Sequence, residues 1–539
     1  MMAEWTLPPG VATRYEAHFG DRVVRCFSDR VSDIYDTLAR AVAARGEEEA
    51  VICGPERLTY AEFGRRVERV AGGLAVRGIG PGDRVALLLG NRVEFLLTVY
   101  AALRLGAIAV PMGTRLQTPE IAYILDHAGA KALVVEPELL GRLPARAETP
   151  ELTDIYVPGT YLEGGAAGAY DFALLDGDPP PRVVVAEEDT AVILYTSGTT
   201  GRPKGAMLTH FNLAHSLLHF QYGMNLTSAD RMLLAVPASH VTGLVALIML
   251  AVQAQGALIM MPEFKARPFL ELAARERMTN GILVPAMYNL CLLEPDFDRF
   301  DLSAWRVGGY GGAPMPAATI AALAEKLPNL GLMNAYGATE TTSPTTMMPP
   351  QYTREHADSV GLVLPCADVI VMDPEGREVA PGMSGEIWIR GAMTVPGYWR
   401  NPEATAREFT AGYWHSGDVG SKDAQGFVRV FDRVKDMLNR GGYKVYSVEV
   451  ENVLAGHDGV LESAIVAKPC PVLGERVHAF ISRRRHDVTA EELRAFCAAR
   501  LADYKVPESY TLLDEPLPRN ANGKLMKRTL RERLLASMA

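Results

Sequence analysis

The sequence lacks the cysteine pattern of a zinc site or of a fold held together by disulfides. Its 539 residues include six cysteines, and no two of them form a CxxC pair. The first residues, MMAEWTLPPG, contain an early glutamate and two prolines, where a signal peptide needs a basic start and an apolar stretch. We therefore expect a protein of the reducing cytoplasm.

An excess of basic residues and a long apolar segment are missing as well. The formal net charge is -10, whereas a nucleic-acid-binding protein usually presents a basic face. The longest apolar run, Leu244 to Val252, is far shorter than the roughly 18 residues that a membrane-spanning helix needs. We expect no nucleic-acid partner and no transmembrane segment.

What the sequence does contain is an alternation of short apolar runs with helical ones. RVALLLG, VEFLLTVYAALRLG and AIAVPMG follow one another from about residue 82, a pattern typical of a parallel sheet with covering helices. Ligands of such sheets bind where the strands end. After Pro349, hairpin-like runs around turn signals predict a β-rich part. A boundary within DRVKDMLNRGG separates a predicted large domain, residues 1–434, from a smaller α/β domain, residues 435–539.

The segment from Tyr195 to Gly205, YTSGTTGRPKG, is rich in groups that bind phosphate. Backbone N–H groups around glycines converge on phosphate oxygens, and hydroxyl groups and a lysine add donors and charge. It is not a Walker A loop, because Pro203 stands where that motif, counted from Gly198, requires a glycine before its lysine, and this argues against a P-loop kinase. Taken alone, the segment fits a flexible surface turn equally well.

Three later segments also contain residues suited to a nucleotide site. In NAYGATET, the carboxylate of Glu340 is suited to holding Mg²⁺ against phosphates, although a Thr-Glu pair also caps helices. Asp418 and Arg433 are suited to ribose hydroxyls, but equally to a turn and a surface ion pair. Lys524 follows an Asn-Gly turn in a basic segment that could simply be solvated.

Together and in this order, these segments resemble the adenylate-forming superfamily of acyl-CoA synthetases, adenylation domains and luciferases. The resemblance covers nearly the whole chain and includes GGYGGAPM, GEIWIRG, YWHSGDVG and DRVKDMLNRGGYKVYSVEVE. It implies an α/β fold in which a large N-terminal domain of parallel-sheet subdomains and a β-rich subdomain precedes a small mobile C-terminal α/β domain. The implied hinge is Lys435.

The resemblance also implies the nucleotide-binding residues. Those that would wrap the ATP phosphates are Thr196, Ser197, Gly198, Thr199, Thr200, Gly201 and Lys204. Those that would flank the adenine and the acyl carboxylate are Gly312, Ala313, Asn334, Ala335 and Tyr336. Thr339 would contact phosphate and Glu340 would hold Mg²⁺. Asp418 and Arg433 would bind the ribose.

Two half-reactions in one site are a further implication of the resemblance. Lys524 would bridge the carboxylate and the α-phosphate while the acid is adenylated. The small domain would then turn, withdraw Lys524 and bring in the loop of Gly441 and Gly442, which opens a passage for the thiol of coenzyme A.

The implied acyl pocket is mostly apolar. Its lining residues are His240, Gly243, Ala286, Met287, Tyr310, Gly337 and Met347, and His240 joins Lys524, Thr339 and Glu340 as a catalytic candidate. No cation in this set would hold a second carboxylate, so we expect a monocarboxylic acid, whether fatty, cyclic or aryl. Ser239 and Tyr310 depart from common family patterns, which indicates an acyl pocket of different shape.

The predicted function is that of an ATP-dependent carboxylic acid:CoA ligase, with ATP, Mg²⁺ and coenzyme A as cofactors. Only about fifteen residues follow Lys524, which leaves no room for a fused carrier domain, and PASHVTGLVALIML offers no acid to meet an amino-acid ammonium. An enzyme that loads a separate carrier protein stays open as the alternative. A non-catalytic nucleotide-binding regulator is disfavoured by the presence of Thr339, Glu340 and Lys524. A homodimer is compatible with the sequence.

Three histidines on one predicted helix, His210, His215 and His219, raise the question of a metal site. The last two are four residues apart and so share a helix face. No Cys, Asp or Glu nearby completes a ligand set, so we expect these side chains to pack rather than to bind a metal.

Overall fold

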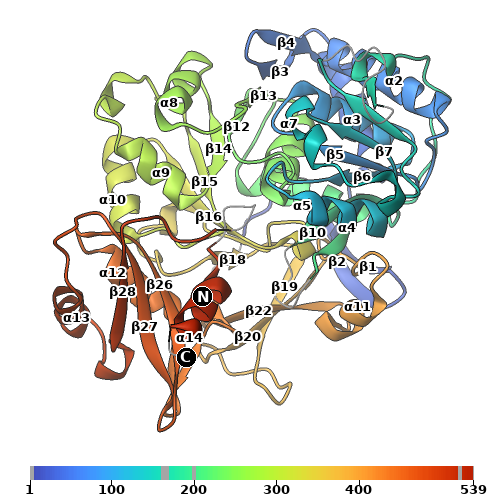
Figure 1. Cartoon of the computed structure of the whole chain (residues 1–539). Coiled ribbons are helices and arrows are strands. Elements are labelled where there is room, and N and C mark those ends of the chain that lie inside the picture. The colour runs from blue at the N-terminus through green and yellow to red at the C-terminus, as the bar shows by residue number, and fades with distance from the viewer. Residues whose placement is uncertain (1–4, 160–168, 197–201, 520–524, 538–539) are drawn as a thin grey trace. The chain divides into compact units, whose positions relative to one another are not determined.

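The computed structural model describes residues 5–159, 169–196, 202–519 and 525–537 (Figure 1). The chain divides into two compact units. The large unit comprises Met1–Val369, Ile389–His415 and Gln425–Phe427, and the small unit comprises Ile370–Trp388, Ser416–Ala424 and Val428–Ala539.

The large unit contains a seven-stranded sheet in the order β11-β10-β6-β5-β7-β8-β9. Its strands are β5 (Arg84–Leu88), β6 (Ile108–Pro111), β7 (Ala130–Val135), β8 (Asp154–Val157), β9 (Ala169–Asp171), β10 (Thr190–Thr196) and β11 (Lys204–Thr209). All neighbours pair in parallel except β10 and β11, which form an antiparallel hairpin.

Both faces of this sheet are covered, which explains why its strands read as continuous apolar runs. Along β5, Val85 and Leu87 join one buried cluster, and Ala86 and Leu88 join another. The covering helices are α2 (Tyr60–Val76) and α3 (Val93–Arg104) in the first cluster and α4 (Thr118–Ala128) in the second.

The second sheet of the large unit runs β4-β3-β13-β12-β14-β15-β16-β17-β18. Its strands are β3 (Glu49–Cys53), β4 (Glu56–Thr59), β12 (Arg231–Leu234), β13 (Ala257–Met260), β14 (Asn280–Leu283), β15 (Val307–Tyr310), β16 (Gly331–Tyr336), β17 (Thr346–Met347) and β18 (Gly361–Val363). From β3 to β16 along this order the pairs are parallel, so the carboxyl ends of these strands share one edge.

Helices and short elements complete the large unit. The helices are α1 (Tyr35–Arg45), α5 (His210–Gly223), α6 (Val241–Gly243), α7 (Leu250–Gln253), α8 (Ala266–Arg275), α9 (Pro285–Leu292), α10 (Ala317–Lys326) and α11 (Pro402–Glu408). A π-helix, η4 (Leu244–Met249), joins α6 to α7, and short strands are β1 (Thr13–His18), β2 (Arg22–Phe27) and β21 (Phe409–Thr410). Its 3₁₀ turns are η1 (Pro137–Arg142), η2 (Arg146–Glu148), η3 (Phe172–Leu174), η5 (Phe297–Arg299), η6 (Thr339–Thr341) and η7 (Pro350–Tyr352).

The small unit has its own core and a five-stranded sheet. Strands β24 (Leu438–Arg440), β25 (Tyr443–Val445), β26 (Val460–Cys470) and β27 (Gly474–Arg483) lie in the order β25-β24-β27-β26, and β28 (Ser509–Leu513) pairs with β27. Helices α12 (Ser447–Ala455), α13 (Ala490–Ala498) and α14 (Lys527–Ala536) and the turn η8 (Asp503–Lys505) belong to it. Four strands cross the division between the units: β19 (Ala367–Met372), β20 (Gly385–Gly391), β22 (Tyr413–Lys422) and β23 (Phe427–Arg433).

The predicted fold class is confirmed. Parallel sheets with helices, a β-rich part and a separate C-terminal α/β unit are all present. The apolar run Leu244 to Val252 is buried in the large unit, and no helix among the described residues is long and apolar enough to cross a membrane. Lys435 is exposed between β23 and β24, and its role as a hinge stays a prediction, as does the boundary at 434.

Candidate active site

The β10–β11 hairpin carries the predicted phosphate loop. Thr196, the last residue of β10, pairs with Lys204, the first residue of β11. Of the residues between them, Ser197, Gly198, Thr199, Thr200 and Gly201 lie outside the described part of the chain.

Helix α4 holds both ends of this loop. Tyr195 Oη and His127 Nδ1 lie 2.8 Å apart, and Tyr123 Oη donates to the carbonyl oxygen of Pro203 over 3.1 Å. The guanidinium of Arg202 lies 5.3 Å from the centre of the Tyr123 ring. Residues at both ends of the loop, Tyr195 and Pro203, are therefore anchored to side chains of α4.

The ammonium of Lys204 is held by two side chains that the sequence did not predict. It pairs with the carboxylate of Glu408, the last residue of α11, and lies 3.3 Å from the hydroxyl of Tyr398. Its Nζ also lies 4.4 Å from the centre of the Tyr398 ring, a distance at which a cation is attracted to an aromatic face.

The same tyrosine reaches the predicted magnesium ligand. Tyr398 Oη lies 3.0 Å from Glu340 Oε1 and 2.8 Å from Glu408 Oε2, and one hydroxyl proton can serve only one of these carboxylates at a time. Thr196 Oγ1 donates to Glu340 Oε1 over 3.3 Å. Thr196, Lys204 and Glu340, which are far apart in sequence, thus meet around Tyr398 and Glu408.

Burial and neighbouring groups together determine the pKa values of Tyr398 and Glu408 in this cluster. Burial, followed by the neighbouring carboxylates of Glu340 and Glu408, raises the pKa of Tyr398 far above its ordinary value, so its hydroxyl stays protonated. Burial also acts to raise the pKa of Glu408, but hydrogen bonds from Lys204, Arg407 and Tyr398 outweigh it and lower that pKa below the ordinary value. Glu408 is therefore an anion that pairs with Lys204.

The predicted adenine segment lies beside the end of β16. Tyr310 of β15 is in register with Asn334 of β16, and a Cβ added at Gly311 would overlap the carbonyl oxygen of Ala335. Gly312 has φ +76°, which favours glycine, and both Gly312 and Ala313 are exposed. Asn334 is buried, whereas Ala335, Tyr336 and Thr339 are partly exposed.

Most of the predicted acyl-pocket residues lie at or after the carboxyl ends of the parallel strands β12, β14, β15 and β16, whereas Met347 ends the antiparallel strand β17, and their burial differs. His240 and Ala286 are exposed, Gly337 is partly exposed, and Gly243, Met287, Tyr310 and Met347 are buried. His240 Nδ1 accepts from the backbone N–H of Thr242 over 3.3 Å and so caps α6. A Cβ added at Gly243 would overlap the carbonyl oxygen of Pro237, so close packing alone requires a glycine there.

The small unit contains the predicted ribose residues as an ion pair. Asp418 of β22 lies opposite Arg433 of β23, and Arg433 Nε lies 2.6 Å from Asp418 Oδ1. Arg433 also donates to the carbonyl oxygen of Ser416 over 3.3 Å. The Asp418 side chain is 8% exposed, so β-sheet register fixes a nearly buried carboxylate.

Gly441 and Gly442 form the two-residue turn between β24 and β25. Arg440 pairs with Tyr443 across it, and the glycines have φ of +59° and +92°. Positive φ at both positions is the geometry of the tight hairpin turn that favours glycine. Lys524, which the sequence predicts to work in alternation with this loop, lies outside the described residues.

The three histidines of α5 accept hydrogen bonds from backbone N–H groups of distant segments. His210 Nδ1 accepts from Ile34 over 3.0 Å, His215 Nε2 from Phe27 over 3.2 Å and His219 Nε2 from Cys366 over 3.1 Å. Burial lowers the pKa of His215 and of His219 to about 3. Neutral imidazoles thus tie α5 to three chain segments.

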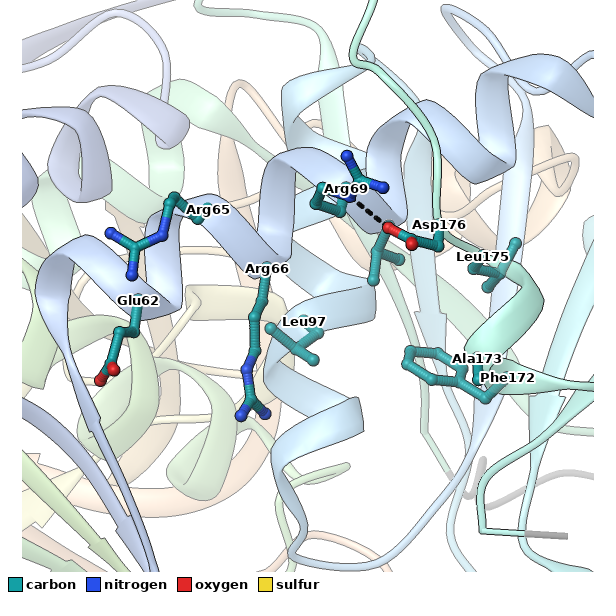
Figure 2. A pocket seen from close by; sticks show the side chains of 10 residues that line it. Glu62, Arg65, Arg66, Arg69, Leu97, Phe172, Ala173, Leu175 and Asp176 are labelled. Atoms are coloured by element: carbon teal, nitrogen blue, oxygen red, sulfur yellow. Dashed lines mark hydrogen bonds and ion pairs between the residues drawn. The ribbon is translucent and has the colours of Figure 1, made fainter.

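A surface depression of about 450 Å³ lies away from these residues, on α2. Figure 2 shows Arg65, Arg66 and Arg69 along the helix and the side chain of Arg69 pointing toward Asp176. Arg69 pairs with Asp176, and Arg66 pairs with Glu56 over 2.5 Å. Carboxylates thus offset the arginine charge, and we assign no ligand to this depression.

Comparison with known proteins identifies the family. Residues 38–399 match the model of the AMP-binding enzyme, and residues 449–524 match that of the AMP-binding enzyme C-terminal domain. A feruloyl-CoA synthase of an Amycolatopsis species is 37% identical, covering 90% of this chain and 95% of that protein. A long-chain-fatty-acid–CoA ligase of Mycobacterium tuberculosis is 35% identical, with 89% and 94% covered. A fatty acid–[acyl-carrier-protein] ligase of Streptomyces coeruleorubidus is 33% identical, with 93% and 97% covered.

Solved structures agree with this result. An anthranilate CoA ligase in complex with anthranoyl-AMP superposes with a TM-score of 0.87 at 27% identity, covering 94% of this chain and 98% of that one. The o-succinylbenzoate coenzyme A synthetase of Bacillus subtilis, in complex with ATP and magnesium ion, has a TM-score of 0.81 at 29% identity, with 93% and 99% covered.

The fold and the family models define an adenylate-forming enzyme, and the chain belongs to the AMP-binding enzyme family. Its activity class is that of an AMP-forming acid–thiol ligase, as the sequence predicted. Tyr398 and Glu408 could not be predicted from the sequence, because no local motif encodes their contacts with Lys204 and Glu340.

Proposed function

We propose that this enzyme joins a monocarboxylic acid with an apolar tail or ring to coenzyme A, at the expense of ATP, through an acyl-adenylate. The observation that carries the proposal is the meeting of Thr196, Lys204 and Glu340 around Tyr398 and Glu408. Phosphate donors, a cation and a carboxylate suited to a metal then lie together beside the loop that the family uses for phosphate.

The first half-reaction needs charge neutralisation, because a carboxylate is a poor nucleophile and ATP is an anion. In our proposal the loop from Thr196 to Lys204 binds the ATP phosphates, with Thr339 beside them, and Lys524 brings the acid's carboxylate to the α-phosphate. The carboxylate oxygen then bonds to the α-phosphorus and pyrophosphate leaves. Preorganised donors in a dry site are the usual source of such rate enhancement.

The residues around Glu340 fit a magnesium ion. Mg²⁺ prefers one or two carboxylates together with phosphate oxygens and water, and Glu340 is a nearly buried carboxylate, 6% exposed, held by Thr196 and Tyr398. Bound Mg²⁺ would supply neutralisation of the phosphate charge. Glu340 would hold it, and Tyr398 would orient the carboxylate.

The remaining nucleotide contacts follow the same assignment. Gly312 and Ala313, with the backbone of Asn334 to Tyr336, would flank the adenine and the acid's carboxylate. Asp418 would accept hydrogen bonds from the ribose hydroxyls, and Arg433 would hold its carboxylate in place, as the 2.6 Å pair does here.

The second half-reaction forms the thioester. The sulfur of coenzyme A attacks the acyl carbon, the bond to AMP breaks, and AMP leaves with the electron pair. We propose that residues 435–539 turn about Lys435 between the two steps, and that the turn of Gly441 and Gly442 then borders the path of the thiol. The positive φ of both glycines supports a backbone that can approach a ligand closely.

The class of acid that the enzyme accepts follows from the residues that we propose to line the acyl pocket. Met287, Tyr310 and Met347 are apolar or aromatic and buried, and none of the proposed lining residues is a lysine or an arginine. His240, exposed at the start of α6, would lie at the mouth of the pocket as a gate. An uncharged tail therefore fits, whether aliphatic or aryl.

A second candidate function is the loading of a separate carrier protein. The relative from Streptomyces coeruleorubidus, whose acceptor is a carrier protein, supports this alternative. The two functions share the first half-reaction and differ only in the thiol.

The test is a product analysis with two acceptors. The enzyme is incubated with ATP, Mg²⁺ and a panel of fatty, cyclic and hydroxycinnamic acids, with coenzyme A in one arm and a carrier protein bearing its phosphopantetheine arm in the other. We expect AMP and an acyl-CoA with at least one uncharged acid. Acylation of the carrier alone would favour the second function, and ADP as the nucleotide product would refute both.

The cellular compartment and the oligomeric state of the enzyme are also part of the proposal. All six cysteines are free thiols, which supports a reducing cytoplasm. A homodimer is our working assembly, and size-exclusion chromatography with light scattering tests it.

A further inference from the structure

Helix α5 presents two polar side chains, Asn212 and Ser216, to the backbone around Glu340. The two residues are four apart in the sequence and so lie on the same face of the helix. Both are fully buried, and buried polar groups bond within the protein. Their partners lie in two chain segments that contact Glu340.

The turn that follows Glu340 has an unfavourable backbone conformation. Thr342 and Ser343 have φ of +51° and +37°, in the left-handed region that residues other than glycine rarely adopt. Such residues persist only where the surrounding structure holds them. Thr342 is fully buried, and within the described part of the chain its hydroxyl has no hydrogen-bond partner. The side chain of Thr342 therefore does not offset the strain.

Ser216 supplies a side-chain hydrogen bond to this turn. Its hydroxyl donates to the carbonyl oxygen of Thr342 over 2.7 Å, and the carbonyl oxygen of Ser343 is a second acceptor. A hydroxyl has one proton, so it donates to one of these carbonyls at a time. The N–H of Ser343 donates to the carbonyl oxygen of Ala338 over 3.2 Å, which closes the turn from within. The closed turn is thus tied to α5.

Asn212 holds the second segment that contacts Glu340. Its amide nitrogen donates to the carbonyl oxygens of Ala392 and Thr394 over 2.8 and 3.0 Å. The N–H of Val395, the next residue, donates to the carbonyl oxygen of Glu340 over 2.9 Å. One face of α5 therefore fixes the backbone of Glu340 by two routes.

The helix that carries Ser216 is itself anchored on both sides of this residue. His215 accepts from the backbone N–H of Phe27, and His219 accepts from that of Cys366. A hydroxyl on a helix held in this way can fix a strained turn, because the helix does not simply follow the turn when it moves.

We propose that Ser216 is a positioning residue for magnesium binding: its hydrogen bond to the strained turn holds the backbone of Glu340, and with it the carboxylate, where the ion binds. This inference rests on the proposed function, because it takes Glu340 as the ligand of Mg²⁺. Without the hydroxyl, the carbonyl of Thr342 loses its side-chain donor and the turn can relax toward ordinary backbone angles. The carboxylate then moves, whereas nucleotide contacts made by other residues stay as they are.

Direct binding of a nucleotide separates the metal-dependent part of its affinity from the rest. The Kd of α,β-methylene-ATP, which cannot be cleaved between its α- and β-phosphorus atoms, is measured by isothermal titration calorimetry with Mg²⁺ and again with EDTA. The ratio of the two values is the gain in affinity that the metal provides. For Ser216→Ala we expect this gain to fall about 3- to 10-fold, the range for the loss of one hydrogen bond, and the Kd in EDTA to stay within about 2-fold of the wild type.

Ser482→Ala is the matched control, because it removes the same atoms from a similar environment. Ser482 of β27 is also a buried serine, and its hydroxyl donates to the carbonyl oxygen of Glu515 over 2.9 Å. This hydrogen bond joins two segments of the small unit, whereas Glu340 belongs to the large unit. Ser482→Ala should leave the gain from Mg²⁺ within about 2-fold of the wild type. Equal losses of the gain in the two variants would mean that Ser216 acts only through the stability of the fold.

Ser216→Cys is the second variant if Ser216→Ala does not fold. It keeps a side chain of similar size with a weaker donor, and we expect a smaller loss of the same gain. An unchanged gain in the folded variant, or an equal loss of affinity in EDTA, would overturn the positioning role. A wild type that binds the nucleotide equally well with Mg²⁺ and with EDTA would instead refute the proposed magnesium site.

Discussion

Tyr398 connects predicted site residues of the large unit. Its single hydroxyl lies within hydrogen-bond distance of two carboxylates and of the Lys204 ammonium. Because its pKa is raised, its hydroxyl stays protonated and donates a hydrogen bond. We assign it the role of holding Glu340 ready for a metal while Glu408 holds Lys204.

Tyr398→Phe should weaken the use of MgATP. The variant keeps the ring under Lys204 but removes the hydroxyl that reaches Glu340, and a hydrogen bond to a charged group contributes about 1.5–3 kcal/mol. We expect the KM for MgATP in ATP–pyrophosphate exchange to rise about 10-fold, since about 1.4 kcal/mol corresponds to a factor of ten.

Tyr413→Phe is the matched control for this variant, because Tyr413 also donates to a carboxylate, that of Asp368, within the large unit. It should leave the KM for MgATP within about 2-fold of the wild type. Equal effects of the two substitutions would mean that Tyr398 acts only through the stability of the fold.

Gly243→Ala should destabilise the protein regardless of substrate. The added methyl group would overlap the carbonyl oxygen of Pro237, and overpacking of this kind costs about 1–3 kcal/mol. Thermal unfolding followed by circular dichroism should show a lower Tm. Gly141→Ala is the control, because a Cβ there meets nothing within 4 Å. An unchanged Tm for Gly243→Ala would leave pocket shape as the only reason for this glycine.

At the scale of elements, helix α5 makes the fold sensitive to acid. His215 and His219 accept backbone N–H groups and are neutral, with a folded-state pKa of about 3 against an ordinary value of 6.5. The unfolded chain therefore binds more protons than the folded one between these values. The stabilisation is complete above about pH 6.5 and is lost as the pH falls toward 3, by up to about 1.4 kcal/mol per pH unit for each histidine.

Urea unfolding at pH 7.5, 6 and 5 measures this dependence. The free energy of unfolding should fall below about pH 6.5, and His215→Gln should flatten the slope, because an amide oxygen can accept the N–H of Phe27 without titrating. His486→Gln, which changes an exposed histidine, should leave the slope as it is. A slope that His215→Gln does not alter would assign the acid sensitivity to other groups.

Elements with a local signal could be predicted from the sequence, and contacts between distant segments could not. The alternation of apolar and helical runs predicted the parallel sheets. YTSGTTGRPKG predicted a phosphate loop only together with the later motifs; the structure pairs its ends, Thr196 and Lys204, and its binding of phosphate stays a prediction. The role of Glu408 depends on a contact with Lys204 across more than 200 residues. The sequence around Glu408 is that of an ordinary helix end, so it carried no signal.

The residues predicted for the acyl pocket show the same limit of prediction from sequence. The resemblance placed Gly243 and Met347 in a substrate pocket, but side-chain environment decides what each can do. Gly243 packs against Pro237, and Met347 lies within 3.0 Å of a Cβ position at Gly223 and is fully buried. Their part in acid binding stays a prediction, because local packing already explains both residues.

At the scale of the whole molecule, the proposed sequence of two half-reactions depends on a turn of residues 435–539 about Lys435. Lys524→Ala should block acyl-adenylate formation and largely spare thioester formation from a supplied acyl-adenylate. Removal of one preorganised charge from a reacting centre costs about 10²–10³-fold. For Lys524→Ala we expect ATP–pyrophosphate exchange to stop or to slow, while thioester formation keeps a nearly normal rate.

Arg528→Ala is the control for this substitution, because it removes an exposed cation four residues away on α14. Both half-reactions should proceed normally in that variant. Equal loss of both half-reactions in Lys524→Ala would contradict the assignment of this lysine to the first step alone.

The central claim is that the acid's carboxylate oxygen attacks the α-phosphorus of ATP. The most direct measurement uses a substrate acid labelled with ¹⁸O in its carboxylate and analyses the nucleotide product by mass spectrometry. The account predicts one ¹⁸O atom in AMP for each thioester formed. Unlabelled AMP, or label in a phosphate released with ADP, would contradict it.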